Sequence, residues 1–404
     1  MRTVIDLEDA QRRVLAACPP LAPLAMARGD ALGCVLAGDV VAVEDVPPFD
    51  NSAVDGYAVR SADLIAGPVE LDVVGEVAAG APPFAGTVQP GQAVRVMTGA
   101  AMPGGADAAA MVEDSERLDG ERVRLYRAVA AGSAVRRAGD DVRTGDVVFT
   151  AGTVVTPAVL GVLASINAVD VTAHRPVRVA VLSTGDELVT DGGPLRPGQI
   201  RESNSTMLAP LLAAAGCSVT ALGVVADDEA ELEQVLRRAA ADHDAVVTSG
   251  GVSMGDFDVV KAVLGRIAEM QWMQIAIKPA KPFAFGTLDG VPVFGLPGNP
   301  VSSLVSFELL ARPALRRMMG HRRLARPSVV AVSDDGLARH PDGKVHLVRV
   351  IGEFGNDGRY HVRPVGAQGS HQLAATALAD AIAVVPDGDG VPPGADVAAL
   401  FLNG

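Results

Sequence analysis

The sequence predicts a multidomain protein in which a central parallel α/β domain of Rossmann-like type is combined with β-rich domains. The chain has 404 residues, which is more than one hydrophobic core usually supports. Strand and helix patterns alternate from residue 176 to residue 319, as in a parallel α/β sheet. Short alternating apolar runs punctuated by Gly and Pro occupy residues 47–141 and the stretch after 323, as in small β domains.

The first segment predicts a helical domain that is interrupted by an insertion. Apolar residues recur at helical spacing in 6–17 behind Asp6, a suitable N-cap, and Thr156 with Pro157 begins a second helix after a hairpin at 142–155. The β-rich stretch lies between these two pieces. We therefore predict an elongated, discontinuous helical domain made of residues 1–46 and 142–176, with an inserted β-rich domain at residues 47–141.

The second half predicts an α/β domain at residues 177–322, followed by a C-terminal β-barrel domain at residues 323–404. Asp228 with Glu231 has the spacing of a capping box, and Asn299 with Pro300 supplies the N-cap and first position of a long helix over Val301–Met319. Short strands return after Arg323, separated by Gly and Asp turns, as in a small barrel or sandwich.

Composition excludes several classes of protein. Lys and Arg total 34 against 48 Asp and Glu, a formal charge of −14, so we expect no nucleic-acid partner, whose binder would need a basic surface. The three cysteines lack metal-ligand spacing, which favours a reducing cytoplasm. The N-terminus is acidic, and the longest apolar stretch is broken by polar residues. We therefore expect a cytoplasmic protein with no export signal and no membrane span.

Three polar turns follow strands of the α/β domain and are expected to line one crevice. They are STGDEL (Ser183–Leu188), TSGGVSMGDFD (Thr248–Asp258) and LPGNPVS (Leu296–Ser302). Each alone also fits an ordinary structural turn, but ligands of open α/β sheets collect beyond the carboxyl ends of the strands. Backbone N–H groups at such turns can hold anions. The candidate substrate-binding residues are Ser183, Thr184, Gly185, Ser249, Gly250, Gly251, Ser253, Gly298 and Asn299.

Acids and lysines beside these turns predict a metal-assisted anion site. Asp258 and Glu187 follow crevice turns and are candidate ligands of Mg²⁺ or its waters, although an Asp at a helix start also fits an N-cap. Lys278 and Lys281 flank Pro279, which keeps the backbone extended and projects both side chains; two solvated surface lysines are the alternative. The residues taken alone predict a site for phosphate-bearing substrates.

Eight segments together resemble one family, the molybdopterin molybdenumtransferases, which are related to the E domain of gephyrin. In order along the chain they read FDNSAVDGYA, MTGAAMPGGADA, STGDELV, ESNSTML, TSGGVSMGDFD, IKPAKPFAFG, GLPGNPVSS and QGSH. The resemblance extends from about residue 5 to residue 400. It identifies the α/β domain as molybdopterin-binding, with a fold shared with molybdopterin adenylyltransferases.

The resemblance also implies an activity and its partners. The family takes adenylylated molybdopterin and molybdate, inserts the metal into the dithiolene and releases AMP with Mg²⁺ dependence. An elongated homodimer with sites between the subunits is implied, as are transient contacts with molybdopterin adenylyltransferase and with apo-molybdoenzymes. Phosphoanhydride cleavage of this kind depends mainly on positioning and charge neutralisation, which the metal, the lysines and the backbone donors would supply.

Site residues are carried over by motif. Asp258, Glu187 and Asp227 match the crevice acids of the family, and Asp55 and Thr98 match functional residues of its β domain. The positions associated with molybdate binding correspond to Lys278, Lys281, Pro282, Ser302, Arg349 and Ser370. Arg349 suits an oxyanion because a guanidinium is always charged and offers several donors.

Two residues depart from the pattern of the family. Gln274 stands where a Lys is often found, which removes a positive charge, and Ala280 stands where Gly is usual, which adds a methyl group to a turn. We expect retained activity with altered anion affinity, and molybdate binding equal to that of a Gln274→Lys variant would show that Gln274 has no effect.

Two other functions are compatible with parts of the sequence. The molybdopterin adenylyltransferase step would predict a short chain of one domain with a different Gly-rich turn, whereas this chain carries GGVSMGDFD and three further domains. A dimeric scaffold or binding protein is the alternative from another class, and a peptide partner without AMP release would support it.

Overall fold

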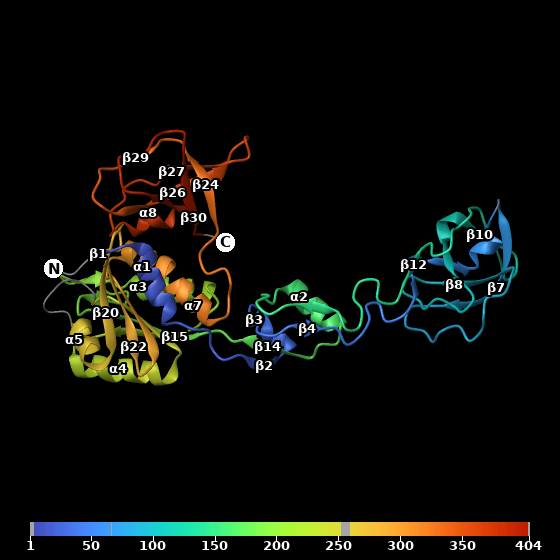
Figure 1. Cartoon of the computed structure of the whole chain (residues 1–404), viewed down its shortest axis with the longest axis horizontal. Coiled ribbons are helices and arrows are strands. Elements are labelled where there is room, and N and C mark those ends of the chain that lie inside the picture. The colour runs from blue at the N-terminus through green and yellow to red at the C-terminus, as the bar shows by residue number, and fades with distance from the viewer. Residues whose placement is uncertain (1–3, 66, 252–258, 403–404) are drawn as a thin grey trace. The chain divides into compact units, whose positions relative to one another are not determined.

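The computed structural model describes residues 4–65, 67–251 and 259–402. Contacts divide the chain into two compact units, whose elements are labelled in Figure 1. Unit 1 comprises residues 1–24, 33–37 and 173–404, and unit 2 comprises residues 25–32 and 38–172. Within the described residues, no helix combines the length and apolar character needed to cross a membrane. The four domain boundaries drawn from the sequence stay a prediction.

A seven-stranded sheet forms the centre of unit 1, with the strand order β1-β20-β22-β23-β19-β15-β18. Its strands are β1 (Val4–Ile5), β15 (Arg178–Thr184), β18 (Ser218–Val225), β19 (Ala245–Ser249), β20 (Glu269–Ile275), β22 (Pro282–Leu288) and β23 (Val291–Leu296). Neighbours from β18 to β23 run parallel, which confirms an α/β core. β22 is antiparallel to both β20 and β23, so the expected parallel sheet is in fact mixed.

β22 reverses direction because only two residues separate it from β23. Asp289 has φ 50° and Gly290 has φ 82°, values that suit a two-residue hairpin turn. Leu288 pairs with Val291 directly across this turn. Parallel neighbours would require a crossover of about a dozen residues or more, so the short connection dictates the antiparallel arrangement.

Helices cover both faces of the sheet because apolar side chains on its strands alternate. In β15, Val179 and Val181 belong to one buried cluster with α1, α3 and α6, whereas Ala180 and Leu182 belong to another with α4 and α5. The helices are α1 (Leu7–Ala16), α3 (Asn204–Ala214), α4 (Glu229–Asp242), α5 (Val259–Ile267) and α6 (Pro300–Ser306). As expected, Asp6 caps α1 and Asp228 caps α4.

The placement of α1 differs from the sequence-based expectation. We assigned this helix to the helical domain of residues 1–46 and 142–176, but Ala10 and Val14 are fully buried in the core of unit 1. β1, which precedes α1, pairs with β20 at the edge of the α/β sheet. The spacing of apolar residues identified the buried face of α1, but it did not indicate which hydrophobic core this face packs against.

The long helix predicted over Val301–Met319 contains a wider turn. It consists of α6, the π-helical segment η4 (Phe307–Ala311) and α7 (Arg312–Met318). Pro313 explains the irregularity, because proline lacks an N–H and its ring clashes with the carbonyl of the residue four positions earlier in a regular α-helix. The expected start is confirmed, with Asn299 at the N-cap and Pro300 in the first turn.

Asp244 connects the starts of β15 and β19 through charged hydrogen bonds. Its carboxylate accepts from Arg175 at 2.8 Å and from Arg178 at 2.9 Å, and also from the backbone N–H of Arg178 at 2.8 Å. Burial acts to raise the pKa of Asp244, but these donors outweigh it and hold the pKa well below its usual range.

We predict that Asp244→Asn lowers the free energy of unfolding by about 2 kcal/mol at pH 7. Because the folded pKa lies below the ordinary value of 3.8, the contribution of Asp244 is present above that pH and declines as pH falls further. Urea unfolding at pH 7 and at several values below 4 measures both effects. A difference between the two proteins that stays constant across this range would contradict the assignment.

The C-terminal part of unit 1 forms the expected barrel. Five strands close in the order β26-β27-β24-β30-β28 and back to β26. They are β24 (Ser328–Ser333), β26 (Val345–Phe354), β27 (Tyr360–Pro364), β28 (Ala381–Val385) and β30 (Ala395–Phe401). β21 (Ile277–Lys278) adds to β26 in parallel and so joins the α/β part to the barrel. Shorter elements of unit 1 are β3 (Val35–Leu36), β16 (Leu188–Val189), β17 (Ile200–Arg201), β25 (Leu337–Ala338), α8 (Leu373–Ala377) and β29 (Gly390–Val391).

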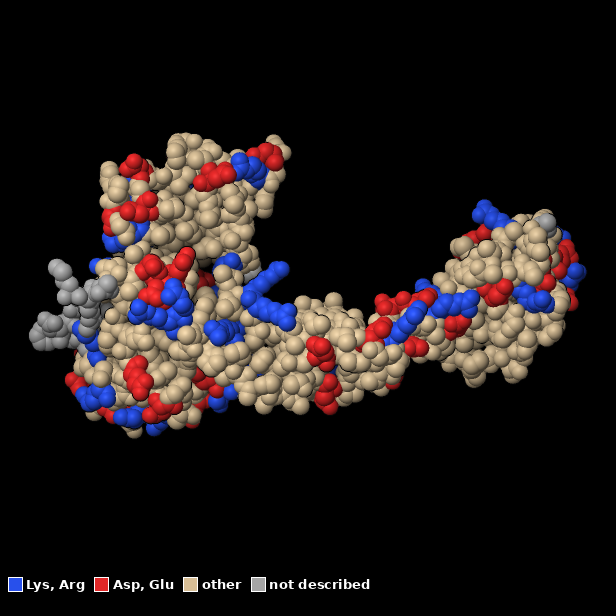
Figure 2. Space-filling model, viewed as in Figure 1, with Lys and Arg blue, Asp and Glu red and all other residues tan. Residues whose placement is uncertain are grey.

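Unit 2 contains a six-stranded sheet with the order β10-β11-β7-β8-β6-β9. Its strands are β6 (Gly56–Val59), β7 (Val69–Val77), β8 (Gln92–Val96), β9 (Ala108–Met111), β10 (Ser115–Leu118) and β11 (Arg122–Leu125). Ion pairs between neighbouring strands, such as Arg122–Glu70 at 2.6 Å, lie on its surface. Opposite charges are likewise interspersed over the face of the protein in Figure 2.

Short elements complete the chain. They are β2 (Leu24–Ala27), η1 (Arg28–Ala31), β4 (Val40–Val41), β5 (Asn51–Ser52), η2 (Ser61–Asp63), η3 (Val112–Asp114), β12 (Val135–Arg136), β13 (Val147–Phe149), α2 (Pro157–Ser165) and β14 (Asp170–His174). The predicted N-cap of α2 is confirmed, because the Thr156 side chain accepts from the N–H of Val159.

Candidate active site

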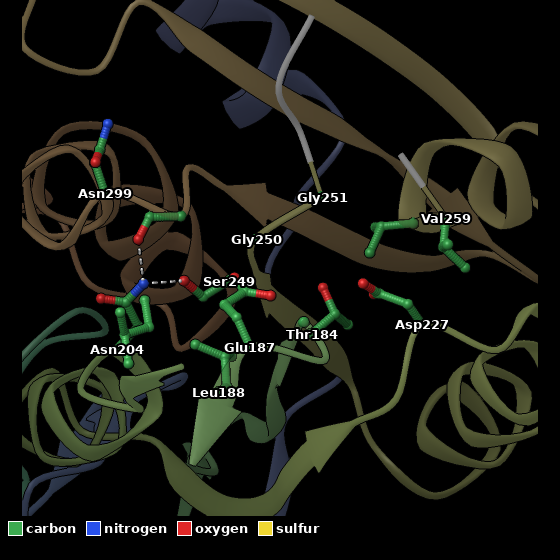
Figure 3. Close-up of a pocket in the computed structure, with 14 residues that line it drawn as sticks. Thr184, Glu187, Leu188, Asn204, Asp227, Ser249, Gly250, Gly251, Val259 and Asn299 are labelled. Atoms are coloured by element: carbon green, nitrogen blue, oxygen red, sulfur yellow. Dashed lines mark hydrogen bonds between the residues drawn. The ribbon is translucent and has the colours of Figure 1, made fainter. Parts of the chain in front are cut away.

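A cavity of about 570 Å³ lies at the carboxyl ends of β15, β19 and β23. The three predicted turns all contribute to its wall (Figure 3). The predicted residues that line it are Thr184, Gly185, Glu187, Asp227, Ser249, Gly250, Gly251, Gly298 and Asn299. Ser183 is buried behind the wall, where its hydroxyl donates to Glu202. Ser253 and Asp258 lie outside the described residues.

The turn after β15 depends on glycine. Gly185 has φ 143°, and a Cβ at this position would lie 2.6 Å from a carboxylate oxygen of Glu187. Glu187 therefore folds back over Gly185, with its side chain exposed to the cavity. A side chain at 185 would displace the carboxylate, so the glycine and the acid form one local arrangement.

The turn after β19 depends on glycine for a different reason. Gly250 and Gly251 have φ 100° and φ 68°, which L-residues with side chains seldom adopt. The N–H of Gly250 donates to the carbonyl of Leu296 at 3.1 Å, which joins this turn to the end of β23. A Cβ on Gly250 would lie 2.9 Å from the carbonyl oxygen of Thr184. The three strand ends therefore meet around a single glycine.

Two acids enter the cavity from neighbouring strand ends. Glu187 follows β15 and Asp227 follows β18, and Thr184 and Asp227 extend toward each other in Figure 3. Asp227 is held by its backbone N–H, which donates to Asp186 at 3.0 Å. Exposed carboxylate oxygens are the donors that Mg²⁺ prefers. No group of three potential metal ligands occurs within residues 4–65, 67–251 and 259–402, so the expected Glu187 and Asp258 pair stays a prediction.

The cavity also contains residues that the sequence reasoning missed. Asn204 lies at its wall with Nδ2 donating to the Ser249 hydroxyl at 2.8 Å and to the carbonyl of Gly298 at 2.7 Å. Leu188, Ile200, Val259 and Val260 add an apolar part to the lining. The segment ESNSTML contains Asn204 and was noted as a motif, but nothing in its pattern indicated contact with two of the three turns.

A second cluster joins the barrel to the start of α6. Arg349 on β26 is 1% exposed, and its Nη2 donates to the carbonyls of Ala367 at 2.9 Å and Gly369 at 3.3 Å. The next residue, Ser370, accepts at its carbonyl from the N–H of Val301. Ser302 follows in α6 and is also buried. The structure thus connects Ser302, Arg349 and Ser370 through neighbouring residues, and their role in molybdate binding stays a prediction.

Arg349 has unused hydrogen-bonding capacity. Its Nε and Nη1 atoms are buried and find no partner among the residues that the structure describes. Burial lowers the pKa of the Arg349 guanidinium, yet arginine stays charged in proteins at neutral pH. A buried cation with two free donor atoms is costly without an acceptor. The arrangement favours an anion at this point.

Of the two predicted lysines, one lines a second cavity and the other is exposed. Lys278 lines a cavity of about 490 Å³ together with Gln368 and Gly369, and the Gln368 side chain hydrogen-bonds the backbone of Arg349. Lys281 is exposed, and its carbonyl accepts from the N–H of Ile275. Pro282 begins β22 and pairs with Gln274. Lys278 is therefore connected to the Arg349 cluster.

Ala280 lies between these lysines in a strained conformation. Its φ is 76° and it is only 2% exposed. The left-handed region costs a residue with a Cβ about 1–2 kcal/mol, which explains why Gly would be favoured at this turn. The departure noted in the sequence therefore carries a backbone cost in addition to its extra methyl group.

Asp55 and Thr98 contact each other in unit 2. The Asp55 carboxylate accepts from the Thr98 N–H at 2.7 Å and from its hydroxyl at 2.8 Å. The backbone and side-chain hydrogen bonds from Thr98 lower the pKa of Asp55. The two residues that the resemblance paired as functional therefore form one local structure, and their contribution to catalysis stays a prediction.

Three family models match the chain along its length. Residues 5–167 match the MoeA N-terminal region (domain I and II), residues 180–317 match a model described as "Probable molybdopterin binding domain", and residues 335–402 match the MoeA C-terminal region (domain IV).

Curated relatives and solved structures agree with these matches. The molybdopterin molybdenumtransferase of Haemophilus influenzae is 38% identical over 373 residues, 92% of each chain. Molybdopterin molybdenumtransferase 2 of Mycobacterium tuberculosis is 40% identical over 400 residues, 96% of each chain. A crystal structure of the molybdopterin biosynthesis protein MoeA from Pyrococcus horikoshii is similar with a TM-score of 0.82 and 31% identity, covering 100% of both chains.

Proposed function

This chain belongs to the molybdopterin molybdenumtransferase family, and from that premise we propose that it inserts molybdenum from molybdate into adenylylated molybdopterin, releasing AMP and forming molybdenum cofactor. The main support for this proposal is the position of the start of α6, which connects the cavity of the three turns to the Arg349 cluster. Asn299 at its N-cap lines the cavity of the three turns, and two residues later Val301 binds Ser370 of the Arg349 cluster. The start of α6 therefore lies beside the cavity of the three turns and is connected to the cluster of Arg349, two of whose guanidinium nitrogens find no partner among the described residues.

The cavity suits the phosphate-bearing part of the substrate. Gly-rich turns after strands present backbone N–H groups that can hold phosphate oxygens. Glu187 and Asp227, together with Asp258 outside the described residues, would hold Mg²⁺. A Mg²⁺ ion held there would supply positive charge against the phosphate oxygens. The backbone N–H groups of the turns would hold the phosphates in one orientation and so prevent unproductive ones.

The Arg349 cluster suits molybdate, which is the other substrate. Its guanidinium can donate from Nε and Nη1 to oxyanion oxygens, and the Ser302 hydroxyl lies in the same region of the fold. Lys278 adds a positive charge at the neighbouring cavity. Charge-assisted hydrogen bonds of this type are roughly twice as strong as neutral ones. We propose that molybdate is held here while the molybdopterin part of the substrate approaches from the cavity of the turns.

One assay tests the proposed function. Purified protein is incubated with adenylylated molybdopterin, Mg²⁺ and molybdate, and AMP release is followed together with activation of an apo-molybdoenzyme. We expect stoichiometric AMP release and cofactor formation that both depend on molybdate. Absence of AMP release from the unmodified protein would refute the enzyme proposal.

The role of Glu187 in Mg²⁺ binding gives a separate prediction. Glu187→Gln keeps the size of the side chain but removes its charge, so we expect the Mg²⁺ concentration for half-maximal AMP release to rise about tenfold. Glu231→Gln is the matched control, because Glu231 is an exposed carboxylate in the first turn of α4 and does not belong to the described lining of the cavity. An equal Mg²⁺ requirement in the unmodified protein and Glu187→Gln would exclude Glu187 as a ligand.

We also propose the remaining properties that the family resemblance implies. These are a homodimer, a cytoplasmic location and transient contacts with molybdopterin adenylyltransferase and apo-molybdoenzymes. Sedimentation equilibrium tests the first, for which the mass of 41.3 kDa per chain should appear doubled. A monomeric mass at micromolar concentration would contradict the dimer.

A further inference from the structure

Glu202 binds the turn after β15 to the start of α3. It follows β17, and its Oε1 accepts from the Ser183 hydroxyl at 2.9 Å and from the N–H of Ser205 at 2.7 Å. Oε2 accepts from the Ser205 hydroxyl at 2.7 Å. Burial acts to raise the pKa of Glu202, but these donors outweigh it and the pKa is lowered. Glu202 is therefore an ionised, largely satisfied carboxylate behind the wall of the cavity.

Asn204 binds the other two turns. The Ser249 hydroxyl, which accepts from Asn204 Nδ2, belongs to the turn after β19, and the Gly298 carbonyl belongs to the turn after β23 (Figure 3). The carbonyl of Gly298 can only accept, so the amide orientation of Asn204 is defined by its own contacts. Its Oδ1 is buried with no partner in the described part of the chain. Burial of an unpaired Oδ1 costs free energy, which the two hydrogen bonds donated by Nδ2 must offset.

Two residues of one segment therefore contact all three turns that line the cavity. Glu202 reaches the first turn through Ser183, and Asn204 reaches the second and third through Ser249 and Gly298. The turns come from strands that are far apart in the sequence, and backbone contacts such as Gly250 to Leu296 join only some of them. The segment Glu202–Asn204 is the common point of attachment.

We propose that Glu202 and Asn204 are positioning residues that set the separation of the three turns, so that both halves of a phosphate-linked substrate are engaged at once. This inference rests on the proposed function. Simultaneous engagement makes the second contact effectively intramolecular, and the advantage disappears when the geometry of the two halves no longer matches. A misplacement of about 1 Å can cost about a hundredfold in rate. Each turn taken alone would still hold its own fragment.

Substitutions of Glu202 and Asn204 distinguish a positioning role from an effect on the stability of the protein and from an effect of the Glu202 charge. In Asn204→Ala and in Glu202→Ala, affinity for adenylylated molybdopterin should fall about a hundredfold, whereas affinity for AMP alone should change less than about threefold. Glu202→Gln retains an acceptor oxygen for Ser183 and should recover most of the affinity. If the negative charge of Glu202 were what matters, Glu202→Gln would lose as much affinity for adenylylated molybdopterin as Glu202→Ala.

The experiment uses calorimetric titration of the full chain with adenylylated molybdopterin and, separately, with AMP. Thr156→Ala is the matched control: it removes the N-cap of α2 in unit 2 and should lower stability by about 1 kcal/mol without changing either affinity.

Binding of neither ligand by the unmodified protein would refute the proposed function and with it this inference. Normal binding by the unmodified protein with equal binding by both alanine variants would refute the positioning role alone. Equal losses for the linked substrate and for AMP would also overturn it.

Discussion

Gly250→Ala should reduce the affinity for adenylylated molybdopterin by about a hundredfold and lower the free energy of unfolding by about 2 kcal/mol. Two physical effects combine at this position. Gly250 has φ 100°, which strains any residue with a Cβ, and the added methyl would lie 2.9 Å from the carbonyl oxygen of Thr184. That oxygen belongs to the backbone at the end of β15 and cannot move as a flexible side chain could. The turn after β19 must therefore shift away from the turn after β15, and both line the cavity.

A matched glycine separates strain from displacement of the turn. Gly145 in unit 2 has φ 93°, and nothing lies within 4 Å of the Cβ that alanine would add there. Gly145→Ala should therefore show the strain alone, a loss of about 1–2 kcal/mol, with unchanged substrate affinity. Chemical denaturation and calorimetric titration of both variants provide the comparison. If Gly250→Ala and Gly145→Ala lose the same stability and neither loses affinity, the close approach of the turns has no role in binding.

The sequence was sufficient to predict that three turns meet at one cavity, but not how these turns are held. Strands followed by Gly, Ser and Asn turns predicted one crevice, because the carboxyl ends of parallel strands share an edge. Thr184, Gly250 and Asn299 do line one cavity. Asn204 was missed, because its side chain acts through contacts with residues 45 and 94 positions away. No local pattern encodes contacts at that separation.

The two errors in the predicted fold have different origins. Apolar periodicity located α1 and identified its buried face, but Ala10 and Val14 pack against the α/β core rather than in the helical domain that we expected. The reversal of β22 was encoded locally, in Asp289 and Gly290, and could have been predicted from the two-residue turn. Local signals thus specify elements and turns, whereas the choice of packing partner depends on the assembled chain.

Arg349→Met should strongly weaken the binding of molybdate without the loss of stability that usually follows removal of a buried charged residue. Arg349 is almost fully buried, and two of its three guanidinium nitrogens find no partner in residues 4–65, 67–251 and 259–402. Met fills a similar volume and removes this desolvated charge, although the carbonyls of Ala367 and Gly369 lose a donor. These effects oppose each other, so we expect the free energy of unfolding without added anion to change by less than about 2 kcal/mol.

Molybdate affinity should respond far more strongly. One charge-assisted hydrogen bond contributes about 1.5–3 kcal/mol, so removal of the guanidinium should weaken molybdate binding by about tenfold to a hundredfold. Molybdate should raise the unfolding temperature of the unmodified protein by mass action, and Arg349→Met should need about ten to a hundred times more molybdate for the same rise. Arg339→Met is the informative control, because the Arg339 side chain is only 3% exposed but is already paired with Asp342 at 2.8 Å and Asp387 at 2.6 Å. Its loss should lower stability by about 3–5 kcal/mol and leave molybdate affinity intact. If the two variants instead behaved alike, the unpartnered nitrogens of Arg349 would have no specific function as an anion ligand, since burial of an arginine alone would account for both results.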